Sequence, residues 1–302
     1  MPISVAYRPA QTTSVAAQVQ LDGWAAGQTS PGTFDAQGTL WVLQNFDGWW
    51  NGPAPRTDFV PIPGNHGAYD APAYLDARTI TLEGVAVAVD IASVHRSRDV
   101  LASVCGDPSL TATLLVTEPG QPQRQCVVRR SAETKTEPVG PFHFAWSMIL
   151  TAPDPRRYAA VASSAAVGLP GVGSGGLVFP LVFPLTFGTG ALGGSLSVTN
   201  SGTLQTWPTF TILGPVSSPI IRNTGTGESL LFDPAFSVAA GQTLVINTAN
   251  RTVTYSGANA RQSLFTANWF PLYPGPTSLQ FTSLGSYDAA AQLTVSWRDA
   301  WA

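Results

Sequence analysis

Three histidines are the side chains best suited to bind a metal or to move a proton near neutral pH, and they lie far apart in the chain. They are His66, His95 and His143. No HxxH or HExxH spacing brings two of them onto one helix face, so a zinc site is not expected. We expect His66 to complete a turn and His143 to be a polar residue of a strand.

Paired carboxylates could hydrolyse a glycoside, and six aspartates crowd the first quarter of the chain. They are Asp22, Asp35, Asp47, Asp58, Asp70 and Asp76. Asp22 and Asp47 directly precede a glycine, and in segments rich in glycine and proline aspartate commonly stabilises turns. We therefore rank a hydrolase third among the possible functions. It would require two carboxyl groups about 5 to 10 Å apart in one cleft.

Other catalytic motifs are missing from the sequence. Gly193-Gly-Ser195 precedes a predicted strand instead of following one into a helix, which excludes a nucleophile elbow there. The dinucleotide fingerprint, the P-loop and the EF-hand are also absent. Cys105 and Cys126 are the only cysteines, and we expect both to be reduced core thiols. The sequence predicts no catalytic residue, no cofactor and no bound metal, and hence no enzyme.

Aromatic residues are the one feature that suggests binding. The chain has nine tryptophans, most of which we expect in the core. Trp49 and Trp50 differ from the rest, because adjacent residues of an extended segment point to opposite faces. At least one of the two should contact a partner, so we predict a protein interface at Trp49 and Trp50.

Composition favours a turn-rich β protein of two domains. The 302 residues include 29 glycines and 25 prolines, and only 11% are charged, against about 25% in a typical soluble protein. A net charge of −3 and a single lysine, Lys135, give no basic footprint for nucleic acid. No apolar run reaches the length of a membrane span and no secretory signal is evident. We expect a soluble protein made in a cytoplasm, with no membrane insertion.

Alternating apolar residues predict strands in the first half. Residues 142–151 show the clearest period of two, and residues 78–89 show another with a bulge at Gly84. Residues 110–116 and 124–130 complete the strands that we expect in this half.

One helix interrupts these strands. Asp90 can cap a helix over residues 90–105, which Gly106 and Pro108 would end. By contrast, residues 48–74 mix prolines and glycines with little periodicity and are predicted to be a long loop. Long loops on rigid scaffolds are often binding surfaces.

The second half predicts a sandwich or barrel of short strands. Polar turns suggest hairpins within residues 222–228 and 246–253. The expected strands are 196–199, 206–213, 229–232, 243–248, 251–255 and 292–297.

A stretch of small residues separates the two halves. We predict a domain over residues 1–158, a Gly/Ala/Ser linker over 159–176 and a second domain over 177–302. The expected fold class is mainly β, with two domains of β-sandwich type, the first of which has a single helix packed on its sheet.

Several short motifs, in their order, resemble the distal tail proteins of long-tailed siphovirus-type phages, often labelled minor tail proteins in viruses of actinobacteria. The resemblance covers most of the chain. It rests on Gly64-Asn-His-Gly-Ala68, Ala77-Arg-Thr-Ile-Thr-Leu-Glu-Gly84, Leu150-Thr-Ala-Pro-Asp-Pro-Arg-Arg-Tyr158, Phe179-Pro-Leu-Val-Phe-Pro-Leu-Thr-Phe-Gly188, Gly214-Pro-Val-Ser-Ser-Pro-Ile221, Asn247-Thr-Ala-Asn-Arg-Thr-Val253, Trp269 with Leu272-Tyr-Pro-Gly275, and Val295-Ser-Trp-Arg-Asp-Ala-Trp301.

The resemblance implies a structural protein of the virion, assembled in the host cytoplasm and placed at the phage tail tip or baseplate. Six copies would form a ring whose N-terminal domains make the ring contacts. The ring would join the major tail tube protein to the tail hub, or tail-associated protein, and to the host-recognition parts. Its lumen would hold the tape measure protein and pass DNA without binding it specifically. The alternative is a carbohydrate-binding module that contacts the host surface, which exposed coplanar tryptophans in the C-terminal domain would favour.

Overall fold

The computed structural model describes residues 17–27, 33–107, 109–171, 194–285 and 287–302. The chain divides into two compact units, an N-terminal unit up to residue 160 and a C-terminal unit over residues 161–301, with residue 302 grouped with the first. The motif at 179–188 and residues 172–176 of the expected linker lie outside the described residues.

One sheet forms the N-terminal unit, and it curls round until it closes. Its strands follow the order β12-β13-β9-β4-β2-β1-β10-β11-β14, and β11 also pairs with β13. Because β13 thus meets both β9 and β11, the sheet is barrel-like. The bounds are β1 (Gln18–Leu21), β2 (Trp24–Gly27), β3 (Thr33–Phe34, beside β4), β4 (Leu40–Asp47), β9 (Arg78–Val87), β10 (Ala112–Thr117), β11 (Arg124–Arg130), β12 (Lys135–Gly140), β13 (His143–Ala152) and β14 (Arg157–Ala159).

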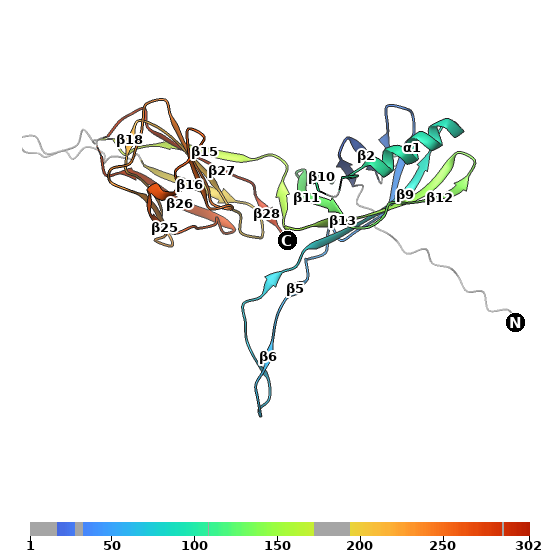
Figure 1. The fold of residues 1–302 in the computed structure, drawn as a ribbon, viewed down its shortest axis with the longest axis horizontal. Coiled ribbons are helices and arrows are strands. Elements are labelled where there is room, and N and C mark those ends of the chain that lie inside the picture. Colours follow the sequence, from blue (N-terminus) through green and yellow to red (C-terminus); the bar gives the residue numbers. More distant parts are fainter. Residues whose placement is uncertain (1–16, 28–32, 108, 172–193, 286) are drawn as a thin grey trace, which may run out of the picture. The chain divides into compact units, whose positions relative to one another are not determined.

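The predicted helix is confirmed as α1 (Ile91–Ser103), which lies against this sheet (Figure 1). Asp90 is its N-cap and accepts a hydrogen bond of 2.7 Å from the Ser93 amide. The helix buries Val94 and Leu101 against the core, and the Ser97 hydroxyl lies 2.8 Å from the hydroxyl of Thr39. A mainly β fold with one helix in the described residues is therefore confirmed.

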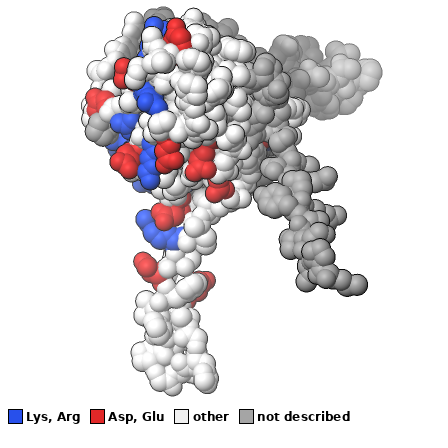
Figure 2. Space-filling view, turned by 90° about the vertical axis from the view of Figure 1, so that its right-hand side faces the viewer, with Lys and Arg blue, Asp and Glu red and all other residues white. Residues whose placement is uncertain are grey.

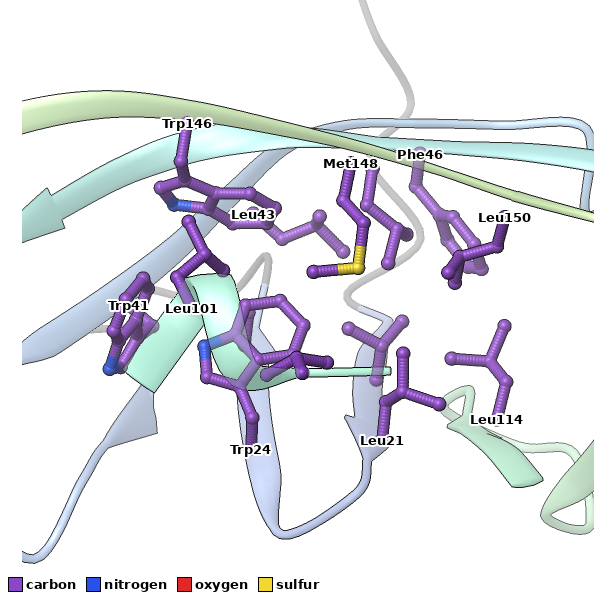
Figure 3. Packing of buried hydrophobic residues seen from close by; sticks show 14 of the residues in the cluster. Leu21, Trp24, Trp41, Leu43, Phe46, Leu101, Leu114, Trp146, Met148 and Leu150 are labelled. Carbon is purple, nitrogen blue, oxygen red and sulfur yellow. The ribbon is translucent and has the colours of Figure 1, made fainter. Parts of the chain in front are cut away.

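Tryptophans fill the centre of the closed sheet. Trp24 packs edge-to-face on Trp41 and Trp146, with ring centroids 5.6 and 5.1 Å apart. Figure 3 shows these rings beside Leu101 of the helix and Met148 of β13. The alternation predicted over residues 142–151 is confirmed, because every second side chain of β13 from Phe144 to Ala152 is buried.

The expected bulge at Gly84 is wrong. β9 continues through Gly84 with its alternation intact, and the register shift lies opposite it in β4, between Leu43 and Asn45. A Cβ on Gly84 would come within 1.9 Å of the Val42 carbonyl oxygen and 2.8 Å of the Trp146 ring. The glycine is thus needed for close packing of the neighbouring strand and ring.

The C-terminal unit is a sandwich of two antiparallel sheets. One sheet has the order β15-β27-β17-β22-β23-β24 and the other the order β16-β26-β19-β20-β25. The bounds are β15 (Ser163–Gly168), β16 (Ser195–Asn200), β17 (Thr209–Leu213), β19 (Pro219–Asn223), β20 (Ser229–Phe232), β22 (Thr243–Asn247), β23 (Thr252–Tyr255), β24 (Ala258–Asn259), β25 (Leu264–Ala267), β26 (Gly275–Ser283) and β27 (Gln292–Trp297). The short pair β18 (Val216–Ser217) and β21 (Ser237–Val238), the 3-10 turn η1 (Arg261–Ser263) and β28 (Ala300–Trp301) complete this unit.

Both predicted hairpins are present, as β19–β20 and β22–β23. The prediction of a linker is wrong for residues 163–168, which form β15 and pair with β27 along its whole length. Ala165 and Val167 pack on the core and Leu169 is buried, so the segment has the period of two of an edge strand, built from small side chains. No helix in the described residues is long and apolar enough to cross a membrane.

Candidate functional site

A two-stranded arm replaces the predicted loop at residues 48–74. We define the arm as residues 52–77. β5 (Pro55–Arg56) pairs with β8 (Tyr74–Leu75), and β6 (Val60–Pro61) pairs with β7 (Ala68–Tyr69), as Figure 1 shows. A turn closes the tip, where the Ile62 amide donates to the Gly67 carbonyl over 3.1 Å. The sequence shows no strand periodicity here because neither face of the arm is buried.

The arm exposes large apolar side chains along its length. Phe59 is 60% exposed and Tyr74 is 63% exposed, and Val60, Tyr69 and Leu75 are exposed as well. Figure 2 shows charged residues on the body of the unit and on the upper part of the arm, whereas the tip has none. A lone hairpin cannot bury such side chains within itself, and several exposed apolar side chains on one element favour an interaction site.

At Gly48, where the chain enters the arm, the backbone lies very close to the start of β9. This residue has a φ of +80°, and a Cβ there would lie 1.9 Å from the Thr79 carbonyl oxygen of β9. A side chain would force the outgoing strand away from the returning one. Glycine thus lets the two ends of the arm start side by side.

Arg78, where the chain returns from the arm, bonds to the segment through which the chain enters it. Its Nη1 donates to the carbonyl oxygens of Gly48, Trp49 and Asn51 over 2.7, 3.0 and 2.7 Å. Its Nε donates to the carbonyl of Pro155 over 2.8 Å. Burial lowers the pKa of Arg78 from its ordinary value.

The two adjacent tryptophans share one acceptor. Trp49 is fully buried and stacks near Phe46, whereas Trp50 is 41% exposed. The indole N–H groups of both donate to the carboxylate of Glu118, over 3.4 Å from Trp49 and 2.5 Å from Trp50. Both rings also pack on Phe46, with centroids 5.9 Å away for Trp49 and 4.9 Å away for Trp50, so the two side chains differ in exposure and do not point to opposite faces as expected from the sequence. Trp49 belongs to the core, and Trp50 is the one available to a partner.

We call residues 48–51, together with Arg78 and Glu118, the root of the arm. Buried charged side chains surround this root. The Arg157 guanidinium lies over the ring of Trp49 at 5.5 Å from its centroid. Burial and the charge of Arg78 lower the pKa of Arg157 to about 10, so it stays protonated at neutral pH. Burial also raises the pKa of the Cys126 thiol to about 12, which keeps this free cysteine unreactive. Cys105, also free, is only partly buried.

The residues weighed for catalysis do not assemble into a site. His66 lies at the arm tip, His95 on α1 and His143 at the start of β13. No group of three or more metal-binding side chains occurs among the described residues.

Two of the six aspartates, Asp22 and Asp35, serve in turns. Asp35 accepts hydrogen bonds from the backbone N–H groups of Gln37 and Thr39. Asp58 and Asp70 lie on the arm. Asp22 and Asp107 line one surface hollow. Hydrogen bonds from Ser109 lower the pKa of Asp107, however, whereas a glycosidase needs a general acid with a raised pKa.

The tryptophans in the described part of the C-terminal unit are buried or half-buried. Trp297 is buried, and Trp207, Trp269 and Trp301 are half-buried. Arg261 covers Trp269, with its guanidinium carbon 5.2 Å from the ring centroid. Within the described part of this unit, therefore, no pair of exposed tryptophans favours the alternative function.

Sequence reasoning missed two residues of the root, Arg78 and Glu118. Arg78 lies on the same face of β9 as Ile80 and Leu82, so the alternation already assigns it an inward position. Glu118 precedes a Pro-Gly turn, where an exposed side chain is the ordinary expectation.

Comparison with known proteins gives one family and one fold. Residues 201–301 match the family described as siphovirus-type tail component, C-terminal domain. The fold is similar to the crystal structure of SPP1 Dit, described as a paradigm of the hub adsorption apparatus in phages that infect Gram-positive bacteria, with a TM-score of 0.66, 14% identity, and 95% of this chain and 99% of that chain covered.

A chain in the structure of the phage P2 baseplate in its activated conformation with calcium is also similar, with a TM-score of 0.48 and 13% identity over 93% of this chain and 97% of that one. Among curated proteins no sequence matches the chain.

Proposed function

We propose that this chain, a structural component of the siphovirus tail tip of the distal tail protein type, forms a closed ring of six copies through its N-terminal unit. The ring acts as an adaptor between the tail tube and the tail hub with its host-recognition parts. The observation that carries the proposal is the exposed apolar arm, which extends from a firmly bonded root and has no partner surface of its own.

A closed ring needs two different complementary patches on each copy. The arm supplies one of these two patches. The rotation that relates neighbouring copies in a ring would place it against the next copy. The large exposed side chains of the arm are aromatic or aliphatic, and such residues dominate the energy of protein interfaces. The low charge of the chain, 11% of residues, is compatible with large contacts between copies.

The proposed neighbours are the major tail tube protein, the hub or tail-associated protein, and the tape measure protein in the lumen. A net charge of −3 suits a channel that passes DNA without retaining it. The host is proposed to be an actinobacterium, from the order of the sequence motifs alone. Assembly takes place in the host cytoplasm.

Electron microscopy of the purified chain tests the proposal. Six copies of the 31.7 kDa chain weigh about 190 kDa, and class averages should show rings with six-fold symmetry. The same ring should appear at the tip of the intact tail. Rings of another order would contradict the stoichiometry. Isolated single chains, both alone and in the presence of tube and hub proteins, would contradict the proposal as a whole.

A further inference from the structure

We infer that Arg78 is the positioning residue of the arm, and that its guanidinium fixes the direction in which residues 52–77 leave the sheet. The effect on assembly rests on the proposed function, whereas the effect on the direction of the arm does not.

The hydrogen bonds of Arg78 connect three segments just beyond the points where the ladders β4–β9 and β9–β13 end. Gly48, Trp49 and Asn51 lie where the chain enters the arm, and Arg78 itself lies where the chain returns. Pro155, on the opposite side of the guanidinium, belongs to the segment between β13 and β14. The guanidinium donates from Nε to Pro155 and from Nη1 to the three carbonyls at the entry of the arm, two nitrogen positions fixed in one plane. The ammonium group of a lysine has a single nitrogen and cannot occupy both positions.

The burial of Arg78 shows that it does more than fill space. The residue is 2% exposed, all four of its acceptors are neutral carbonyl oxygens, and its buried Nη2 has no hydrogen-bond partner in the described part of the chain. Burying a charge without a carboxylate is unfavourable. An apolar side chain would pack at this inward position of β9 without that penalty. What the arginine adds is a set of directed bonds to the root of the arm.

Other contacts at the root also fix the position of the arm. At Gly48 the outgoing strand lies so close to the Thr79 carbonyl that a Cβ would not fit between them. Glu118 holds the indoles of Trp49 and Trp50 just after Gly48. Beyond Asn51 the arm is exposed nearly throughout, so its direction depends on contacts made at this root.

Distance measurements between spin labels test the inference in the full chain. One label goes on the arm tip, through Asn65→Cys, and the other on the exposed Ser131, through Ser131→Cys, in a Cys105→Ser background. The variants are Arg78→Lys, which keeps the charge, and Arg78→Met, which keeps the length. Arg56→Lys, at an exposed arginine of β5, is the matched control. Each variant is measured as a monomer and is also assayed for assembly by sedimentation.

We expect one narrow distance in the parent chain and in Arg56→Lys, and a distribution at least twofold broader in Arg78→Lys and Arg78→Met. An unchanged width in both Arg78 variants would overturn the inference. Loss of the native thermal transition in both would also overturn it, because Arg78 would then be a folding residue. A broadened distance with unchanged assembly would support the positioning role and contradict the view that assembly depends on the direction of the arm. A broadened distance with no assembly in any variant, the parent included, would support the positioning role and contradict the proposed function.

Discussion

At the scale of single residues, the adjacent tryptophans have different roles: Trp49 stabilises the fold, and Trp50 is available for assembly. Trp49 is buried beneath Arg157 and contacts Phe46, whereas its neighbour Trp50 is partly exposed beside the start of the arm. Both indoles donate to Glu118, so the pair differs in exposure more than in hydrogen bonding. The same substitution should therefore mainly weaken assembly at Trp50 and mainly lower the stability of the monomer at Trp49.

Replacing Trp50 with serine should weaken assembly and lower the free energy of unfolding of the monomer by about 1.5 to 3 kcal/mol, the value of a hydrogen bond to a charged group such as Glu118. Replacing Trp49 with serine should cost about 3 to 5 kcal/mol, because it empties a buried site. Denaturant unfolding and sedimentation of both variants check this pair. Unimpaired assembly of Trp50→Ser would count against an interface at this residue.

At the scale of elements, the sequence predicts those strands that bury one face over many residues. β13 and β9 have long alternating patterns, and Asp90 marks the start of α1. β4 is not evident from the sequence, because its bulge between Leu43 and Asn45 shifts the alternation halfway along. β1 and β2 have four residues each, too few for a pattern.

The candidate site was predictable only in part, for a related physical reason. The arm has no buried face, so nothing in its sequence repeats with a period of two. Trp49 and Trp50 stand out by their types, but the environment of each depends on the fold. Arg78 bonds to backbone carbonyls, which every residue has, so no partner side chain could reveal its role.

The N-cap of α1 makes the stability of the fold depend on pH, and the sign of this dependence follows from the pKa of Asp90. The hydrogen bond from the Ser93 amide lowers the pKa of Asp90, with a smaller contribution from Arg96. The carboxylate therefore stabilises the fold above its unfolded pKa of about 3.9, and this stabilisation disappears as the pH falls through the lower folded value. Asp90→Asn keeps a capping side chain without the charge.

The thermal midpoint of the parent chain should therefore fall more steeply between about pH 5 and pH 2 than that of Asp90→Asn. At pH 7 the Asn variant should resemble the parent, whereas Asp90→Ala, which cannot cap, should melt earlier. Parallel curves for the parent and Asp90→Asn would refute the contribution of the charge.

At the scale of the whole molecule, each unit has its own core. Phe210, Phe232, Phe270 and Phe281 are fully buried in one cluster of the C-terminal unit, and the tryptophan-rich cluster belongs to the N-terminal unit. Residues 161–302 expressed alone should therefore fold and melt cooperatively in calorimetry. A fragment without a cooperative transition would show that its core depends on the other unit.

The most direct test of the account replaces residues 53–76 with a short Gly-Asn turn, which removes the arm and keeps Gly48 and Arg78. Phe265→Ser, at an aromatic residue of the C-terminal unit that is 74% exposed, is the control for loss of exposed apolar surface. Mass photometry should find rings of about 190 kDa for the parent and the control, and only 31.7 kDa monomers with an unchanged thermal transition for the armless chain. Rings formed by the armless chain would contradict the claim that the arm builds the assembly.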